Sequence, residues 1–124
     1  MAKDYIKALQ NWRSTEFKSS SGKTEEFKSF VRTVRSYLKQ EVDKSNLQLV
    51  KFNVGHFYIS GFFWNKLNGR YVYFNIGDVR WHLGSHWADS VLYRIANNDR
   101  DFTGGSNRYT KIENLVQDAE AWSM

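Results

Sequence analysis

The sequence predicts a single α+β domain in which helices pack on one face of an antiparallel sheet of three or four strands. Helical periodicity marks residues 2–13, 25–44 and 110–122, which gives two helices before the sheet and one after it. Residues 47–76 and 91–96 are instead rich in Val, Ile, Phe, Tyr and Trp, the residue types that favour strands. Such a succession of elements is typical of helices layered on an antiparallel sheet.

Length and composition restrict the classes of protein to consider. The 124 residues fit one domain spanning 1–124, and an aromatic content of 17% is far above that of disordered chains. There is no cysteine, which excludes disulfides, thiolate zinc sites and cysteine nucleophiles. No apolar run approaches the ~20 residues of a membrane span, and no signal-peptide layout is present, so we expect a cytoplasmic protein that does not enter membranes.

The two N-terminal helices differ in the strength of their patterns. Residues 2–13 carry a short apolar stripe, and a polar run at 19–23 then predicts a loop. The second helix, over 25–44, has Thr24 as a candidate cap and two glutamates in its first turn. Its apolar face is longer and repeats at helical spacing through Phe27, Val31, Val34, Leu38 and Val42.

The segments that follow predict a hairpin around Asn68-Gly69. This pair favours a two-residue type I′ turn, which would place Phe63 opposite Phe74. Because strand side chains alternate, Gly61, Phe63, Val72, Phe74 and Ile76 would then share one face of the sheet. The other face would carry Phe62, Trp64, Tyr71, Tyr73 and Asn75.

The last third contains a strand at 91–96, a polar loop at 97–109 and a final helix. Thr110 and Glu113 have the spacing of a capping box, and an apolar stripe runs on from Ile112 to Trp122.

Positive charge is concentrated in the first half of the chain. Of the formal net charge of +5, all lies in residues 1–53, which hold eleven Lys and Arg against six Asp and Glu. On the second helix, Lys28, Arg32, Arg35 and Lys39 fall within ~60° of one another, and we call these four residues the basic row. Such a row suits a phosphate backbone or an acidic protein groove, and the alternative is an ordinary solvated helix face.

The aromatic side of the predicted hairpin is a second candidate site. Trp64, Tyr71 and Tyr73 could stack unpaired bases or anchor a protein interface. The alternative is that helices cover this side and make it core.

The polar loop is a third candidate. Gly104-Gly105-Ser106 could form a backbone anion nest, whereas the plainer interpretation is an ordered turn before the last helix. The loop residues assigned to partner binding are Arg100, Asp101, Thr103, Gly104, Gly105, Asn107 and Arg108.

Catalytic motifs have little support in the sequence. His82 and His86 stand four residues apart near Asp78 and Asp89, which leaves a small metal-dependent nuclease as a hypothesis. Gly84 lies between the two histidines, and no glutamate follows the first in the manner of a hydrolase motif. We therefore expect no catalytic residue, no metal and no cofactor.

Two segments carry a resemblance to known proteins. The blocks 69–80 (GRYVYFNIGDVR) and 101–107 (DFTGGSN) resemble segments of small proteins carried by bacterial phages, plasmids and conjugative elements. The short, cysteine-free, aromatic-rich chain is also similar in style to anti-CRISPR and other counter-defence proteins. Many of those mimic DNA and are acidic, whereas this chain is basic, so the resemblance implies an inhibitor that occupies an acidic protein patch or engages guide RNA.

These observations together predict a non-enzymatic binding module of a mobile element that inhibits or modulates a nucleic-acid-handling complex of a bacterial host. The expected partner is a protein or ribonucleoprotein complex, and the chain itself would be a monomer or a homodimer. Direct RNA or single-stranded DNA binding is the alternative, the metal-dependent nuclease is third, and a self-associating structural protein remains open.

Overall fold

An antiparallel sheet of five strands in the order β1-β2-β3-β4-β5 forms the centre of the fold. The computed structural model describes residues 25–124 apart from 56, 78–90 and 102–105. In chain order the elements are α2 (Glu25–Asp43), β1 (Leu47–Val54), β2 (Ile59–Asn65), β3 (Tyr71–Ile76), β4 (Val91–Ala96), β5 (Arg108–Thr110), the 3-10 turn η1 (Ile112–Asn114) and α3 (Leu115–Ser123). The predicted α+β class is confirmed, with five strands rather than three or four.

Helix α2 follows its sequence pattern closely. It ends at Asp43, one residue before the predicted end, and two glutamates occupy its first turn, where the helix dipole favours negative charge. The side chains that it buries are Phe27, Phe30, Val34, Tyr37, Leu38 and Val42. The predicted helix over 2–13, the loop at 19–23 and the cap at Thr24 lie outside the described residues, so the described part of the chain has fewer helices than predicted.

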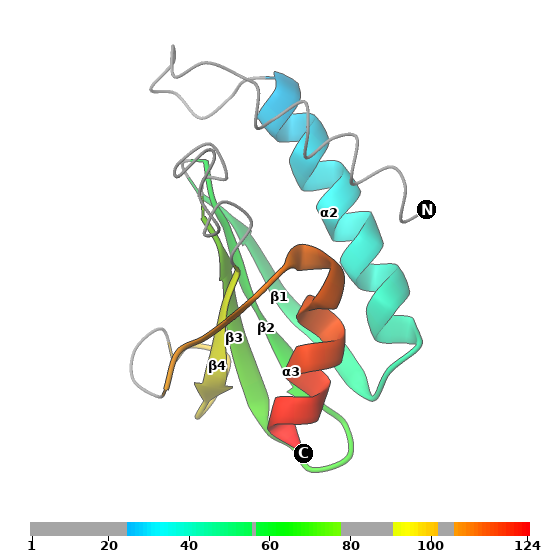
Figure 1. Cartoon of the computed structure of the whole chain (residues 1–124), viewed down its shortest axis with the longest axis vertical. Helices are drawn as coiled ribbons and strands as arrows, with labels where there is room; N and C mark the ends of the chain where they lie inside the picture. The colour runs from blue at the N-terminus through cyan, green and yellow to red at the C-terminus, as the bar shows by residue number, and fades with distance from the viewer. Residues whose placement is uncertain (1–24, 56, 78–90, 102–105) are drawn as a thin grey trace.

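Both helices cover the same face of the sheet (Figure 1). The core between them includes Phe63 and Phe74, whose rings stack at 4.8 Å, and Phe27, which meets Phe57 edge-on at 5.6 Å. These apolar side chains leave water on folding, which is the main source of the stability of the domain.

The predicted hairpin register is wrong by two residues. Phe63 lies opposite Val72 rather than Phe74, and Trp64 lies opposite Tyr71. The turn is longer than the two residues of a type I′ turn. The amide of Asn65 donates to the carbonyl of Arg70 at 2.8 Å, and of the residues between them only Gly69 has a positive φ, of 77°. A shift of two residues preserves the alternation of side chains, so the predicted division of the two faces holds.

Strand β5 and the start of the last helix also differ from the prediction. Thr110 pairs with Val91 in the sheet, and its hydroxyl donates to Asp118 of α3 instead of capping a helix. Lys111 precedes η1 with no side-chain cap, so the capping box is wrong. Part of the polar loop predicted over 97–109 is therefore the fifth strand.

A buried tyrosine connects α2 to the turn before α3. The hydroxyl of Tyr37 donates to the carbonyl of Glu113 at 3.0 Å. Burial, with the carboxylates of Glu41 and Glu113 as smaller causes, raises the pKa of Tyr37 above its ordinary value.

We expect Tyr37 to make the stability of the domain fall in alkaline solution. Because the pKa is higher in the folded state, unfolding favours loss of the proton, and the stabilisation is lost as pH rises from about 10 through the folded pKa. Tyr37→Phe should cost about 1 kcal/mol at neutral pH through the lost hydrogen bond and should flatten this decline. Urea unfolding of both proteins between pH 8 and 11 tests the expectation, and parallel curves would contradict it.

None of the described helices combines the length and the apolar character needed to cross a membrane.

Candidate partner-binding site

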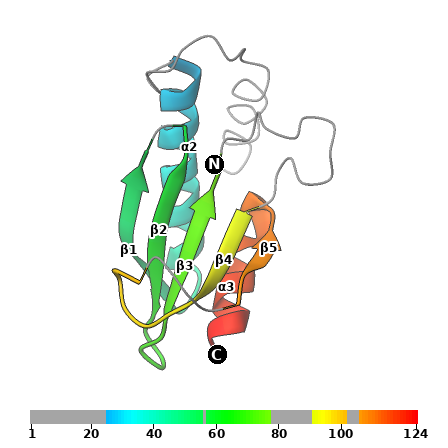
Figure 2. The same ribbon diagram turned by 90° about the vertical axis from the view of Figure 1, so that its left-hand side faces the viewer.

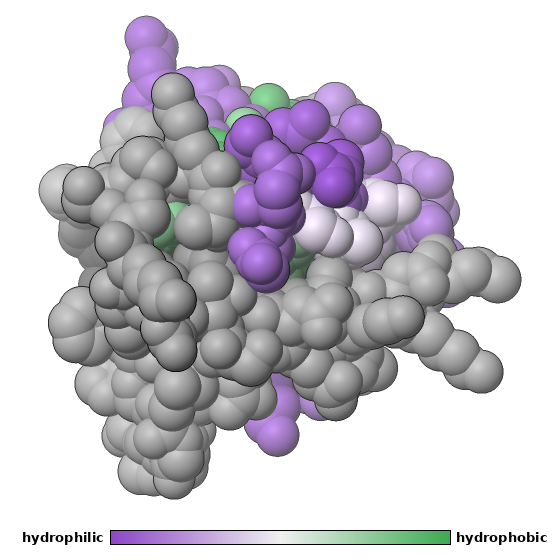
Figure 3. All heavy atoms as spheres, turned by 90° about the horizontal axis from the view of Figure 1, so that it is seen from above, coloured by the Kyte–Doolittle hydropathy of each residue, from purple (hydrophilic) through white to green (hydrophobic). Residues whose placement is uncertain are grey.

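The basic row lies on the solvent side of α2. All four of its side chains are exposed, as the helical spacing predicted. Lys28 forms an exposed ion pair with Glu25 at 3.4 Å, whereas Arg32, Arg35 and Lys39 form no salt bridge with any described residue. Viewed from above, most of the described surface is hydrophilic (Figure 3).

The row follows the flank of α2 that borders β1. The guanidinium of Arg35 lies over the ring of Phe52 on β1, 4.6 Å from its centroid. This contact favours one orientation of the arginine and places it beside the sheet. β1 is an edge strand of the described sheet, so the basic row runs alongside a strand with no neighbour on its outer side in that part of the chain.

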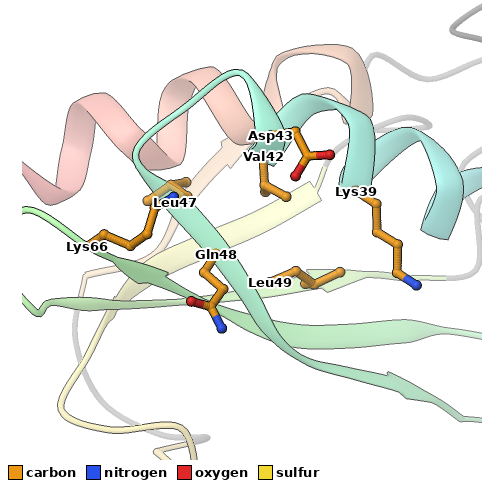
Figure 4. Close-up of a pocket in the computed structure, with 7 residues that line it drawn as sticks. All are labelled: Lys39, Val42, Asp43, Leu47, Gln48, Leu49 and Lys66. Carbon is orange, nitrogen blue, oxygen red and sulfur yellow. The ribbon is translucent and has the colours of Figure 1, made fainter.

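The basic row ends at a pocket, which we call the edge pocket, of about 300 Å³. Figure 4 shows its lining from three elements: the end of α2, the start of β1 and the turn after β2. The residues are Lys39, Val42, Asp43, Leu47, Gln48, Leu49 and Lys66. Only Lys39 of these was a predicted site residue.

The aromatic residues Trp64, Tyr71 and Tyr73 share the face of the sheet away from the helices. All three are half-buried, and Phe62 on the same face is fully buried. Phe62 and Tyr73 pack at 5.3 Å with their rings tilted. The face is therefore neither helix-covered core nor a fully open aromatic surface.

Residues 97–101, which we call the strap, help to cover this face. After β4 the chain turns across the sheet toward β1 (Figure 2). There Asp99 approaches Lys51 of β1 at 3.9 Å, an ion pair in which both side chains are partly exposed. The carbonyl of Asp101 accepts a hydrogen bond from the guanidinium of Arg94 at 3.1 Å.

Arg94 lies beneath the strap and was missed by the sequence analysis. Only 3% of it is exposed, and its guanidinium stacks over Tyr73 at 4.5 Å from the ring centroid. Its Nη1 atom has no hydrogen-bond partner among the described residues. The signal in the sequence was an arginine at an alternating position of an otherwise apolar strand, VLYRIA.

The other predicted loop residues are spread over two places. Arg100 is exposed beside Asp99, and the carboxylate of Asp101 accepts the amide of Asn97 within the strap. Asn107 and Arg108 are exposed near α3, where Arg108 lies 3.4 Å from the ring centroid of Trp122. Thr103, Gly104 and Gly105 lie outside the described residues, so the anion nest stays a prediction.

The predicted residues thus fall on three surfaces rather than one. The basic row borders the β1 edge, the aromatic residues lie under and beside the strap, and Arg108 belongs to β5 at the opposite edge of the sheet.

Among the described residues, no group of three or more His, Asp or Glu side chains could hold a metal ion. The histidines and aspartates of the nuclease hypothesis, His82, His86, Asp78 and Asp89, all lie outside these residues.

Comparisons with known proteins found no protein family, no curated protein and no solved structure that matches the chain.

Proposed function

We propose that this protein is a non-enzymatic binding module of a bacterial mobile element, which inhibits or modulates a nucleic-acid-handling complex by docking its basic row on an acidic surface of a protein in that complex. The observation that carries the proposal is the exposed alignment of four cations on one flank of α2. Three of them form no salt bridge with the part of the chain that the structure describes.

The fixed position of Arg35 supports a protein partner. An arginine that is already oriented loses less conformational entropy when it pairs with a carboxylate, and arginine is enriched among the residues that dominate interface energies. The stacking of Arg35 on Phe52 supplies that orientation. Long-range attraction from the rest of the row would raise the association rate and make it dependent on salt.

Direct RNA or single-stranded DNA binding has less support. That hypothesis needs aromatic rings with open faces on which bases can stack. Tyr73 already has Arg94 over one side and Phe62 against it, and Trp64 is half-buried. The basic row itself could still contact phosphates, so the test must separate protein from nucleic acid.

The test is affinity purification of the tagged protein from a bacterial host, with and without nuclease treatment. We expect a protein partner that survives nuclease and whose affinity for Arg32→Glu/Arg35→Glu is reduced at least tenfold. A control, Lys44→Glu/Lys111→Glu, changes the net charge equally at two exposed lysines outside the row and should retain binding.

Thermal melts of both variants establish that each is folded. Equal binding by the two variants would remove the basic row from the proposal. Recovery of nucleic acid alone would overturn it in favour of direct nucleic-acid binding.

A further inference from the structure

The edge pocket has an apolar floor and a charged rim. Val42 and Leu47 are buried and Leu49 is half-buried, whereas Lys39, Asp43, Gln48 and Lys66 are exposed. Its volume of about 300 Å³ is at the small end of the range for ligand pockets and suits a single large side chain. Such a pocket is typical of the sites that hold the apolar anchor of a partner.

The position of the pocket favours an extended occupant. It opens beside the first residues of β1, whose outer side has no strand neighbour in the described sheet. An exposed strand edge offers amides and carbonyls with which an extended segment can pair. The β1–β2 register shifts between Leu49 and Lys51, and this bulge divides the edge into two regular parts, of which the first, Leu47 to Leu49, lies at the pocket.

The charges at the rim indicate the composition of that occupant. Lys39 is both the last member of the basic row and part of the pocket lining, and Lys66 contributes a second ammonium group from the turn after β2 (Figure 4). Asp43 stands between α2 and β1 at the same rim. A continuous polyanion would be repelled by this carboxylate, whereas a peptide brings backbone N–H donors as well as carboxylates.

From these features we infer that the edge pocket receives one large apolar side chain, such as leucine or phenylalanine, from an extended acidic segment of the partner protein. The neighbouring carboxylates of that segment pair with Lys39 and Lys66, and its further acidic residues continue along the basic row. The inference rests on the proposed function and adds to it the chemistry of the recognised segment.

The experiment is selection from a display library of random twelve-residue peptides against the full-length protein. We expect enriched peptides to share one large apolar residue next to Asp or Glu. Replacing that apolar residue with serine in a synthetic copy should weaken binding at least tenfold. Lys39→Glu/Lys66→Glu should lose the selected peptides, whereas the control Lys44→Glu/Lys111→Glu should keep them.

A spectroscopic measurement locates the peptide. In ¹⁵N–¹H spectra of the labelled protein, a selected peptide should shift the amides of Leu47, Gln48 and Leu49. Shifts confined to the α3 side of the molecule, or peptides that bind Lys39→Glu/Lys66→Glu equally well, would overturn the inference.

Failure of the inference and failure of the proposed function give different results. If the purified partner depends on Arg32 and Arg35 but the library yields acidic peptides without an apolar residue, the basic row binds and the pocket does not. If the purified partner binds Arg32→Glu/Arg35→Glu as well as the unaltered protein, both the inference and the proposed function fail. Tighter binding of an oligothymidine than of any selected peptide would also overturn the inference.

Discussion

Replacing Gly61 with alanine should destabilise the domain by about 3 kcal/mol, because the added methyl group has no room. A Cβ at this position would lie 2.2 Å from the carbonyl oxygen of Lys51 and 2.8 Å from the ring of Phe74. The first contact is with backbone in a neighbouring strand, so it cannot be relieved by rotating a side chain. The ring of Phe74 is also held in place by its stack on Phe63.

Gly77 provides the matched control for this substitution. It follows β3, and a Cβ there would meet nothing within 4 Å. Gly77→Ala should leave stability unchanged or raise it by up to about 1 kcal/mol, since alanine restricts the unfolded chain. Urea unfolding monitored by tryptophan fluorescence compares the two variants. Equal losses of stability would show that the close approach of Lys51 and Phe74 to Gly61 does not cause the loss.

Local patterns were enough to predict α2 and the division of the sheet into two faces. Helical spacing by itself places the basic row on one flank, and alternation by itself separates Trp64 from Phe63. Both conclusions survived the error in the hairpin, because a shift of two residues does not exchange faces. The turn instead makes a long-range contact, in which the side-chain amide of Asn68 donates to the carbonyl of Ser123 at 2.6 Å. A contact with a residue at the other end of the chain is outside the range of a local pattern.

The parts of the candidate site that the sequence did not reveal all join distant elements. The edge pocket needs the end of α2, the start of β1 and Lys66 at once. The burial of Arg94 needs the strap to cross the sheet, and β5 needs a partner strand that is twelve residues or more away in the chain. Arg94 is marked in its own segment only as a charged residue in an otherwise apolar strand. The pocket and the pairing of β5 depend on contacts between segments, which periodicity within one segment does not show.

A second large loss of stability is expected from Asn65→Ala, because Asn65 is a buried connection between the sheet and the C-terminal helix. The side chain is fully buried at the end of β2. Its Nδ2 donates to the hydroxyl of Ser123 at 2.9 Å, and its Oδ1 accepts the amide of Leu67 at 2.9 Å. Alanine would remove both hydrogen bonds together with the contact of Nδ2 with the sulfur of Met124 at 3.7 Å, at a cost of about 3 kcal/mol.

Ser123→Ala separates the two halves of this connection. It removes the hydrogen bonds of the serine hydroxyl with Asn65 and with the carbonyl of Glu120 but leaves the bond from Leu67 to Asn65, so it should cost about 2 kcal/mol. The double variant should lose less stability than the sum of the two single losses, because the two residues share the lost contact. Additive losses in urea unfolding would show that the hydrogen bond between them contributes nothing.

Asn65→Ala should also affect partner binding. Lys66 follows Asn65 directly, and its amide donates to the carbonyl of Asn46 at 2.9 Å. The turn that carries Lys66 is therefore held on one side by the residue before β1 and on the other by Asn65. At a temperature where Asn65→Ala remains folded, we expect peptides selected for the edge pocket to bind about tenfold more weakly, because the lysine is no longer fixed at the rim. Contacts along Arg32 and Arg35 do not depend on this turn and should persist. If the variant keeps full affinity for those peptides while losing stability, Lys66 does not need the turn to be rigid, and the selectivity of the pocket must come from its apolar floor.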